Sequence, residues 1–503
     1  MSMNRKIIIA AAVAFTLGAS SCKKYLNVNT NPNVSQSATL QTLLPAAQLY
    51  LGSGLGVDLQ ITGGFWAQYW TQSPSASQYR LLDQYAPAQD QFSYPWSNLY
   101  EAGENFYQLA ILADSGKAKQ YKAISLLMQA YTFQLITDAW GNVPFTKALK
   151  GAYGKDTFNS HITNPKYDSQ RVVYNGILAY IDSANSLINP NDVILPGADD
   201  LVYGGDMTKW QKFAYTLKLR VLLRLSQVDP VTAQAGIVAL YATPGVAFIG
   251  TGDDAKIAYG FNTANKNPLY AEEAGLGGTQ NLVASSTCID SFKSNSDPRI
   301  GVFYELGLAG DYEVLPQGDF NSTVTTYSIP NVYVAGDAQN SASSKAPVNL
   351  LTSYESLFLQ AEVAARGWVP GDDAALFHAA ITANFNYYNT QITATSGSTG
   401  ADAYATYVAA NGYWTQYPAG GTSTEKLRFI ITQKWFAMCG NQSFESWCEW
   451  RRTGYPDFLR YSKNSLIGNQ FPKRFIYPTS ESTANANFPG LAPLTSNVWW
   501  DVF

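Results

Sequence analysis

Charged side chains are scarce in this chain of 503 residues. Lys, Arg, Asp and Glu together make up 14% of the sequence, against about 25% in typical soluble proteins. The formal net charge is only −4, and no stripe of basic residues alternates with aromatic ones. Nucleic-acid binding, which depends on neutralising phosphates with Lys and Arg, is therefore not an expected function.

Residue types that carry common catalytic chemistry are also few. We interpret the two histidines, His161 and His378, as a turn residue and a packed helix residue. A G-x-S-x-G elbow is missing, and the glycine-rich stretch 52–56 lacks the end of a P-loop. His and Cys do not cluster as zinc sites need, and no Asp-rich loop has EF-hand spacing. A spatial pair of carboxylates for glycoside hydrolysis stays open, but we expect no enzyme, no cofactor and no metal site.

Long apolar runs are limited to the N-terminus. Arg5 and Lys6 precede an uncharged stretch, 7–17, which is too short for a membrane-spanning helix of about 20 residues. The pattern predicts a signal peptide over residues 1–21. Residues 19–22, Ala-Ser-Ser-Cys, then form a bacterial lipobox with Cys22 as the lipidated residue. The alternative is an ordinary cysteine near a cleavage site.

Cysteine is rare after Cys22. Cys288, Cys439 and Cys448 remain, and an odd number of thiols cannot all pair within one chain. An exported protein can oxidise two of them. A disulfide between Cys439 and Cys448 stays open, because the two are close in sequence but lie on successive expected helices.

Aromatic residues are abundant, with 33 Tyr, 24 Phe and 12 Trp. A surface of amides, hydroxyls and rings suits neutral polar ligands such as sugars, whose C–H faces stack on aromatic rings. The densest candidate is the stretch 63–70, in which a continuous helix puts Phe65 and Tyr69 on one face. The candidate ligand-binding residues are Trp66, Tyr69, Trp70, Tyr79, Arg80, Tyr304, Tyr312, Tyr327 and Trp414, each weighed against a role in the core.

Other aromatic and charged residues are assigned to structure. We expect Trp140, Trp210, Trp435, Trp447 and Trp450 to pack in the scaffold. Arg451 and Arg452, with Glu445 and Glu449, are expected to fix the last long helix through pairs three or four residues apart. The alternative for the two arginines is a phosphate or carboxylate site.

Helix periodicity predicts helices over 119–137, 207–227 and 353–366, and stop signals follow the first at Gly141 and Pro144 and the third at Gly367. Asp206 is the expected N-cap of the second helix, and Asp229 with Pro230 opens another. Thr352 with Glu355, and Thr422 with Glu425, fit capping boxes. The fold class is mostly α, with helix pairs as a scaffold and long irregular insertions near 246–350 and 389–423. We expect residues 22–503 to form one domain.

Several stretches together resemble the SusD/RagB-like lipoproteins of Bacteroidetes, in the branch called SusD-like type 2. They run in the family's order over nearly the whole mature chain. The stretches are CKKYLNVNTNPN (22–33), AYTFQLITDAWGNVPF (130–145), KWQKFAYTLKLRVLLRLS (209–226), SYESLFLQAEVAARGW (353–368), IITQKWFAMCGNQSFESWCEWRRTGYP (430–456) and PKRFIYPTSES (472–482).

The resemblance implies a SusD-like fold with four TPR-like helix pairs and a less regular, loop-rich half. It further implies an outer-membrane lipoprotein, anchored through Cys22 and facing the cell exterior. Such a protein closes as a lid over a SusC-like TonB-dependent barrel and hands it oligosaccharides. Two alternatives stay open: the same lid with peptide cargo, and a TPR-type envelope scaffold that binds no small ligand.

Overall fold

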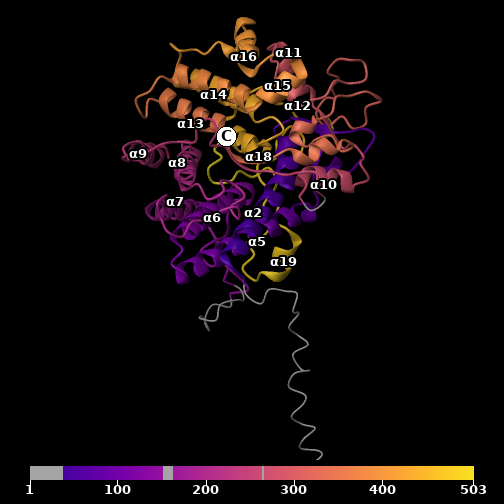
Figure 1. The fold of residues 1–503 in the computed structure, drawn as a ribbon. Coiled ribbons are helices and arrows are strands. Elements are labelled where there is room, and N and C mark those ends of the chain that lie inside the picture. The colour runs from indigo at the N-terminus through magenta and orange to yellow at the C-terminus, as the bar shows by residue number, and fades with distance from the viewer. Residues whose placement is uncertain (1–37, 151–161, 263–264) are drawn as a thin grey trace, which may run out of the picture.

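The structure is a computed structural model that describes residues 38–150, 162–262 and 265–503. Helices dominate it (Figure 1). The helical elements of the first half are α2 (Leu40–Gly54), the π-helical turn η2 (Leu55–Leu59), α3 (Gln60–Trp66), α4 (Arg80–Asp83), η3 (Gln89–Phe92), α5 (Ser93–Ser115), α6 (Lys119–Trp140), α7 (Gln170–Leu187), α8 (Met207–Arg224) and α9 (Pro230–Tyr241). Those of the second half are α10 (Pro268–Gly275), α11 (Ser286–Ser294), α12 (Ile300–Phe303), η4 (Val332–Val334), η5 (Ser341–Lys345), α13 (Ser353–Ala365), α14 (Asp373–Tyr387), α15 (Asn389–Ser396), α16 (Gly400–Ala409), η6 (Tyr413–Thr415), α17 (Ser423–Ala437), α18 (Ser443–Thr453) and α19 (Thr479–Ala484).

The strands are short, and each pair joins segments that are separated in the sequence. The described residues form three antiparallel ladders of two strands each. They are β1 (Trp70–Gln72) with β5 (Leu282–Ala284), β2 (Val143–Pro144) with β3 (Tyr167–Asp168), and β4 (Ala255–Ile257) with β6 (Val348–Leu351). The first ladder joins chain positions more than two hundred residues apart, since Trp70 pairs with Ala284.

The helix pairs form the scaffold that the sequence predicts. Helices α5 and α6, α6 and α7, α8 and α9, and α13 and α14 pack against each other. Figure 1 shows α5 to α9 below and to the left, and α13 and α14 above them, while α10 to α12 lie on the opposite side. The mostly α fold class with loop-rich insertions is confirmed.

The predicted end signals act as expected at most helix termini. Asp206 caps α8 by accepting hydrogen bonds from the backbone N–H groups of Thr208 and Lys209. Thr422 and Glu425 form the full capping box of α17. At α13, Thr352 accepts from the backbone N–H of Glu355, but the Glu355 carboxylate accepts from Gln442 Nε2 instead of closing the box.

The structure corrects two of the expected segments. Residues 389–423 are not an irregular insertion, because α15 and α16 occupy most of that stretch. The stretch 63–70 is not one helix, because α3 ends at Trp66 and Gln68 takes a left-handed φ of 62°. Trp70 then begins strand β1. By contrast, residues 246–350 do consist of short elements joined by loops.

The five tryptophans assigned to packing are all buried, which confirms that assignment. At position 63 only glycine fits without a shift of the backbone. A Cβ at Gly63 would lie 2.3 Å from the backbone nitrogen of Phe444. Helices α3 and α18 therefore touch backbone to backbone. Trp66 of α3 meets Trp447 of α18 edge to face, with ring centroids 4.9 Å apart.

Beneath this aromatic layer lies a network of charges, which we call the ionic core. It joins α6, α8, α13, α17 and α18. Its members are the cations Arg220, Arg224, Arg366, Lys434 and Arg452 and the anions Asp138, Glu355, Glu362, Glu445 and Glu449. Nine of the ten are buried, and Arg366 is 12% exposed in its side chain. The signs balance, so these buried charges are compensated locally.

Helix α18 contributes to the ionic core differently from the sequence prediction. The pair of Arg452 with Glu449 forms as expected but is buried, and Arg452 also binds Glu362 at 2.6 Å. Arg451 donates to the carbonyl oxygens of Asp138 and Lys473, and its guanidinium lies 3.5 Å from the centre of the Trp447 ring. Both arginines therefore act within the fold.

The three described cysteines are free and buried. The pairing left open between Cys439 and Cys448 is absent, since both are free. The Cys448 sulfur accepts a hydrogen bond from Arg451. The sulfur of Cys439 lies 3.7 Å from that of Cys288 on α11. Cys22, the signal peptide and His161 lie outside the described residues. None of the described helices is both long and apolar enough to cross a bilayer.

Candidate functional site

Six of the nine predicted ligand-binding residues are buried in the structure. Each of these six side chains is less than 9% exposed; they are Trp66, Tyr69, Trp70, Tyr79, Tyr304 and Trp414. Their ring faces are covered by other parts of the chain. Contact of these six with a ligand stays a prediction.

The buried rings hold the junction between the scaffold and the loop region. Tyr69 donates a hydrogen bond from its hydroxyl to the carbonyl of Trp435 at 2.6 Å, and Tyr304 donates to the carbonyl of Tyr69 at 2.8 Å. Trp66 donates from its indole nitrogen to the carbonyl of Leu82 at 3.3 Å. These three polar groups thus find partners inside the fold, whereas the buried indole nitrogen of Trp70 has none among the described residues.

Tyr79 lies against buried acidic groups. Its hydroxyl donates to Glu273 on α10 at 2.5 Å. Burial raises the pKa of Glu273 to about 7, and burial together with the charge of Glu272 raises the pKa of Asp58 to about 7. These carboxyls therefore change charge near neutral pH, at the point where η2 meets the loop region.

The other three predicted residues, Arg80, Tyr312 and Tyr327, are partly exposed. The Arg80 guanidinium lies over the ring of Phe320, 5.3 Å from its centre. Tyr327 bonds to Ser73 at 2.9 Å and to Ser75 at 3.0 Å through its hydroxyl. The loop 73–80 and the loop 316–329 are therefore held together.

Tyr327 also lines a hollow that we call the surface groove. The groove has a volume of about 550 Å³, within the usual range of about 300–1,000 Å³ for ligand sites. Its lining residues are Gln280, Tyr327, Ile329, Asp337, Gln339, Asn340 and Ser341. Except for Tyr327, no sequence signal marked these residues, since only folding brings 280 and 337–341 together.

The polar side chains of the surface groove are held by backbone groups. Gln280 donates to the carbonyls of Leu282 and Gly336 and accepts from the N–H of Ala338 at 3.1 Å. Asp337 accepts from the N–H groups of Gln339 and Asn340. The groove thus offers amide, hydroxyl and carboxylate groups in fixed positions beside one aromatic ring.

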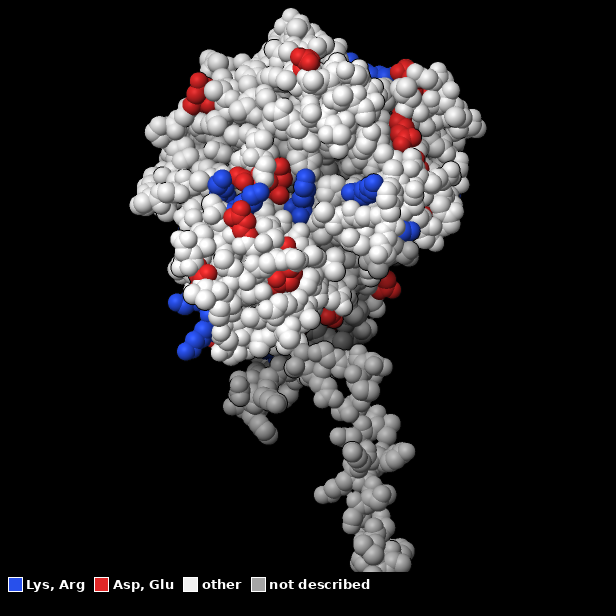
Figure 2. Space-filling view, viewed as in Figure 1, with Lys and Arg blue, Asp and Glu red and all other residues white. Residues whose placement is uncertain are grey.

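The outer surface agrees with the low charge of the sequence. Figure 2 shows one face of the molecule, on which residues other than Lys, Arg, Asp and Glu cover most of the area. The charged residues of this face gather mainly in a band across its middle. A surface with so few charged groups suits neutral polar ligands better than charged ones.

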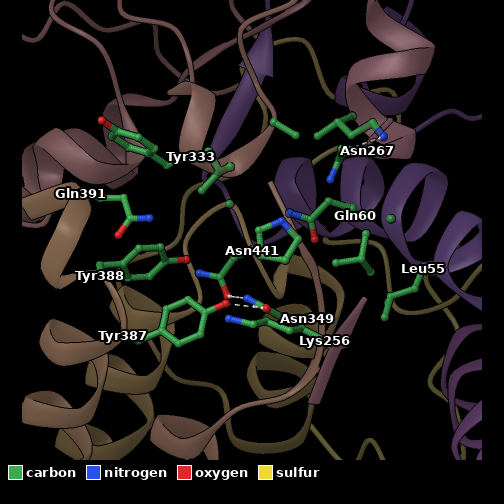
Figure 3. A pocket seen from close by; sticks show the side chains of 17 residues that line it. Leu55, Gln60, Lys256, Asn267, Tyr333, Asn349, Tyr387, Tyr388, Gln391 and Asn441 are labelled. Carbon is green, nitrogen blue, oxygen red and sulfur yellow. Dashed lines mark hydrogen bonds between the residues drawn. The ribbon is translucent and has the colours of Figure 1, made fainter. Parts of the chain in front are cut away.

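A second hollow lies between the scaffold and the loop region, and we call it the central cavity (Figure 3). Its volume is about 160 Å³. Lining residues come from η2, the start of α3, β4, α10, η4, β6, α14, α15 and the turn before α18. Tyr387 donates to Asn349 at 2.7 Å, and Tyr354 behind it donates to Asn441 at 2.7 Å. Sequence reasoning missed this cavity entirely, because its lining segments are scattered along the chain.

The described residues contain no group of three or more His, Cys, Asp and Glu arranged to hold a metal ion. His378 on α14 is partly buried and bonds through Nδ1 to the hydroxyl of Tyr404 at 3.0 Å. Burial lowers the pKa of its imidazole. This partner agrees with the structural role that the sequence predicts for His378.

A family model described as starch-binding and associating with the outer membrane, SusD-like type 2, matches residues 32–478. The chain belongs to the SusD-like type 2 family. This match covers most of the chain and spans, in whole or in part, all six sequence stretches that carry the resemblance. The SusD-like assignment from sequence is therefore confirmed.

Solved structures show the same fold. A chitin-binding protein is 24% identical with a TM-score of 0.76, and the match covers 92% of this chain and 100% of that one. A chitin-binding SusD homologue from Flavobacterium johnsoniae is 22% identical with a TM-score of 0.71, over 91% and 98% of the two chains. A SusD/RagB family protein from Bacteroides thetaiotaomicron is 20% identical with a TM-score of 0.76, over 93% and 99%. No curated protein matches the SusD-like chain significantly.

Proposed function

We propose that this SusD-like protein is an outer-membrane lipoprotein that binds glycans in the surface groove and delivers them to a SusC-like TonB-dependent barrel. The observation that carries the proposal is the family match over residues 32–478, since that family is described as starch-binding and associating with the outer membrane. The names of two structural relatives, which are chitin-binding, support glycan as the ligand class.

The chemistry of the surface groove supports the same ligand class. Hydroxyl groups of a sugar need both donors and acceptors, and Asn340, Gln339 and Asp337 supply them. Tyr327 supplies a ring that covers the C–H face of a pyranose. Its hydroxyl is already bonded to Ser73 and Ser75, so the ring is held in place before a ligand arrives.

Isothermal titration of residues 23–503 against chito-, malto- and other neutral oligosaccharides tests the ligand class. We expect one family of glycans to bind, and Tyr327→Ala to weaken that binding about tenfold through loss of a stacking ring. The matched control is Tyr94→Ala, an exposed tyrosine on α5, which should bind as the wild type does. Heat with peptides and none with any glycan would instead support a peptide-carrying lid.

The lid role and the anchor have separate tests. Purification of the native protein in mild detergent should bring down a barrel of outer-membrane size. A barrel without any small ligand would favour the scaffold alternative. Mass spectrometry of the native N-terminus should find a triacylated Cys22, and an unmodified cysteine would contradict the anchor.

A further inference from the structure

The central cavity is built by segments that meet only in the folded chain. Gln60 comes from the start of α3, Lys256 from β4, Tyr388 from the C-terminal end of α14, and Gln391 from α15. Figure 3 shows these side chains around one hollow. The cavity is separate from the surface groove, because the two share no lining residue.

Lys256 brings a positive charge to this cavity without an anionic partner. In the described ranges of the chain, no carboxylate lies within ion-pairing distance of Lys256 Nζ, which instead lies 4.8 Å from the centre of the Tyr387 ring. The carboxylate of Asp254, two positions earlier, accepts hydrogen bonds from the backbone N–H and the hydroxyl of Ser353 at 2.7 and 2.9 Å. A partly buried ammonium of this kind favours an anion supplied from outside.

Two further donors face the same space. Gln60 is fixed because its Oε1 accepts from the N–H of Ser443 at 3.1 Å. Its Nε2 and the Tyr388 hydroxyl have no hydrogen-bond partner among the residues that the structure describes. In Figure 3 both groups point toward the middle of the cavity. A ligand that fits must therefore bring acceptor oxygens.

One acceptor is also unused. The Oε1 of Gln391 is buried and has no hydrogen-bond partner within the described residues. Protein atoms enclose this oxygen in the structure, and half a turn of the Gln391 amide would bring it to the cavity. There a ligand hydroxyl would satisfy it, whereas a simple inorganic anion such as sulfate has no hydrogen to donate. The rings of Tyr387 and Tyr388 border the same space and can cover apolar C–H groups.

We propose that the central cavity binds a single hexuronic acid, with its carboxylate at Lys256 and a hydroxyl at Gln391. The volume of about 160 Å³ is close to the roughly 150 Å³ of a cavity that holds benzene, so one pyranose with its substituents is the upper limit of size. A disaccharide exceeds it. This site is additional to the glycan binding proposed above and does not depend on it.

Titration of residues 23–503 with glucuronate and galacturonate tests the site. Glucuronamide is the neutral isostere of the first, and glucose lacks the carboxyl group. We expect at least one uronate to bind, and glucuronamide to bind about ten- to a hundredfold more weakly, as for loss of a charged hydrogen bond. Equal binding of glucuronate and glucuronamide, or no binding of either uronate, would overturn the proposal.

Lys256→Met keeps the aliphatic stem of the side chain and removes its charge. This variant should lose about ten- to a hundredfold in uronate affinity and keep the weak affinity for glucuronamide. The matched control is Lys266→Met, because Lys266 also lies over a tyrosine ring, that of Tyr270, at 5.6 Å but does not line the cavity. An equal loss in both variants would contradict a specific role for Lys256.

Two further measurements distinguish a sugar-acid site in the central cavity from the surface groove and from a general anion site. Tyr327→Ala, which alters the surface groove, should leave uronate binding unchanged, so failure of either proposal is visible by itself. Sulfate at the same ionic strength should not compete with glucuronate. Competition by sulfate as strong as by galacturonate would show a general anion site and overturn the assignment to a sugar acid.

Discussion

The scaffold and the loop region of this protein use polar side chains in opposite ways. In the scaffold, five cations and five anions lie together in the ionic core between α6, α8, α13, α17 and α18. In residues 246–350, amide and hydroxyl side chains such as Gln280 and Asn331 bond to backbone groups instead. Ten of the 70 charged residues of the chain thus lie in the ionic core. Residues 246–350 also bury the ion pair of Arg299 with Asp297, but many of their polar contacts use neutral groups.

This difference has consequences for stability. Buried charges are strongly destabilising when one partner is lost, so the ionic core tolerates few arrangements of the helices. Neutral hydrogen bonds near the surface contribute about 1 kcal/mol each and are easily exchanged for bonds to water or ligand. The scaffold is expected to be rigid, and the loop region adaptable.

Arg224→Met is the strongest test of the contrast. Arg224 contacts Asp138, Glu445 and Glu449, so its removal leaves three buried carboxylates short of one cation. We expect the free energy of unfolding to fall by about 3–5 kcal/mol, measured by urea denaturation. Lys122→Met, which breaks the exposed pair with Asp114, should cost less than about 1 kcal/mol. Equal losses would show that burial of the network is irrelevant to stability.

Glu273→Gln tests charge at the edge of the loop region. Its pKa of about 7 in the folded state exceeds the usual Glu value of about 4.3. The folded state therefore binds more protons, and wild-type stability falls as the pH rises from about 4 to 7. At pH 8 the variant should be about 3–4 kcal/mol more stable than the wild type, and at pH 4 nearly equal.

The readout for Glu273→Gln is thermal and urea unfolding at several pH values. Asp58, with its pKa raised in the same direction, keeps part of the slope in the variant. Asp290→Asn on the exposed side of α11 is the control and should change stability far less than Glu273→Gln at every pH. A profile for Glu273→Gln that is parallel to the wild type would refute the buried, protonated state of this carboxyl.

Thr422→Ala removes the cap of α17, a scaffold helix whose N-terminal end is exposed. The bond that the Thr422 side chain makes in the capping box is lost, so we expect a loss of about 1 kcal/mol in urea unfolding. Thr424→Ala, two residues later and inside the helix, is the control and should be neutral or slightly stabilising. A loss at Thr424 as large as at Thr422 would mean that the cap bond does not matter.

Tyr327→Phe is the smallest change and addresses the loop region itself. It removes the hydroxyl that bonds to Ser73 and Ser75 but keeps the ring. We expect a loss of at most about 1 kcal/mol in the free energy of unfolding, and Tyr461→Phe serves as an exposed control. A loss as great as that of Arg224→Met would break the contrast between the two regions.

Local signals in the sequence were sufficient for the scaffold. The N-cap at Asp206, the capping box at Thr422 and the helix that begins at Lys119 depend on residues within a few positions of each other, and each is present. The packing role of Trp447 followed from the same local pattern. Short-range chemistry is visible in one sequence.

The candidate sites were much less accessible to sequence reasoning. Trp70 belongs to an aromatic cluster in the sequence, but the left-handed turn at Gln68 and the pairing with Ala284 carry it into the core. Lys256 has no distinguishing sequence signal. It lacks an anionic partner because the Asp254 carboxylate bonds to Ser353 instead, and this contact forms only in the folded chain. Burial and pairing are long-range properties, and no spacing rule expresses them.

The three thiols beneath the helices, at Cys288, Cys439 and Cys448, are each 0% exposed. A maleimide added to the folded protein cannot reach them until α11, α17 or α18 separates from its neighbours. The rate of alkylation therefore records how often these helices open under native conditions. The three native cysteines thus report the transient opening of these helices, and no additional cysteine has to be introduced into the protein.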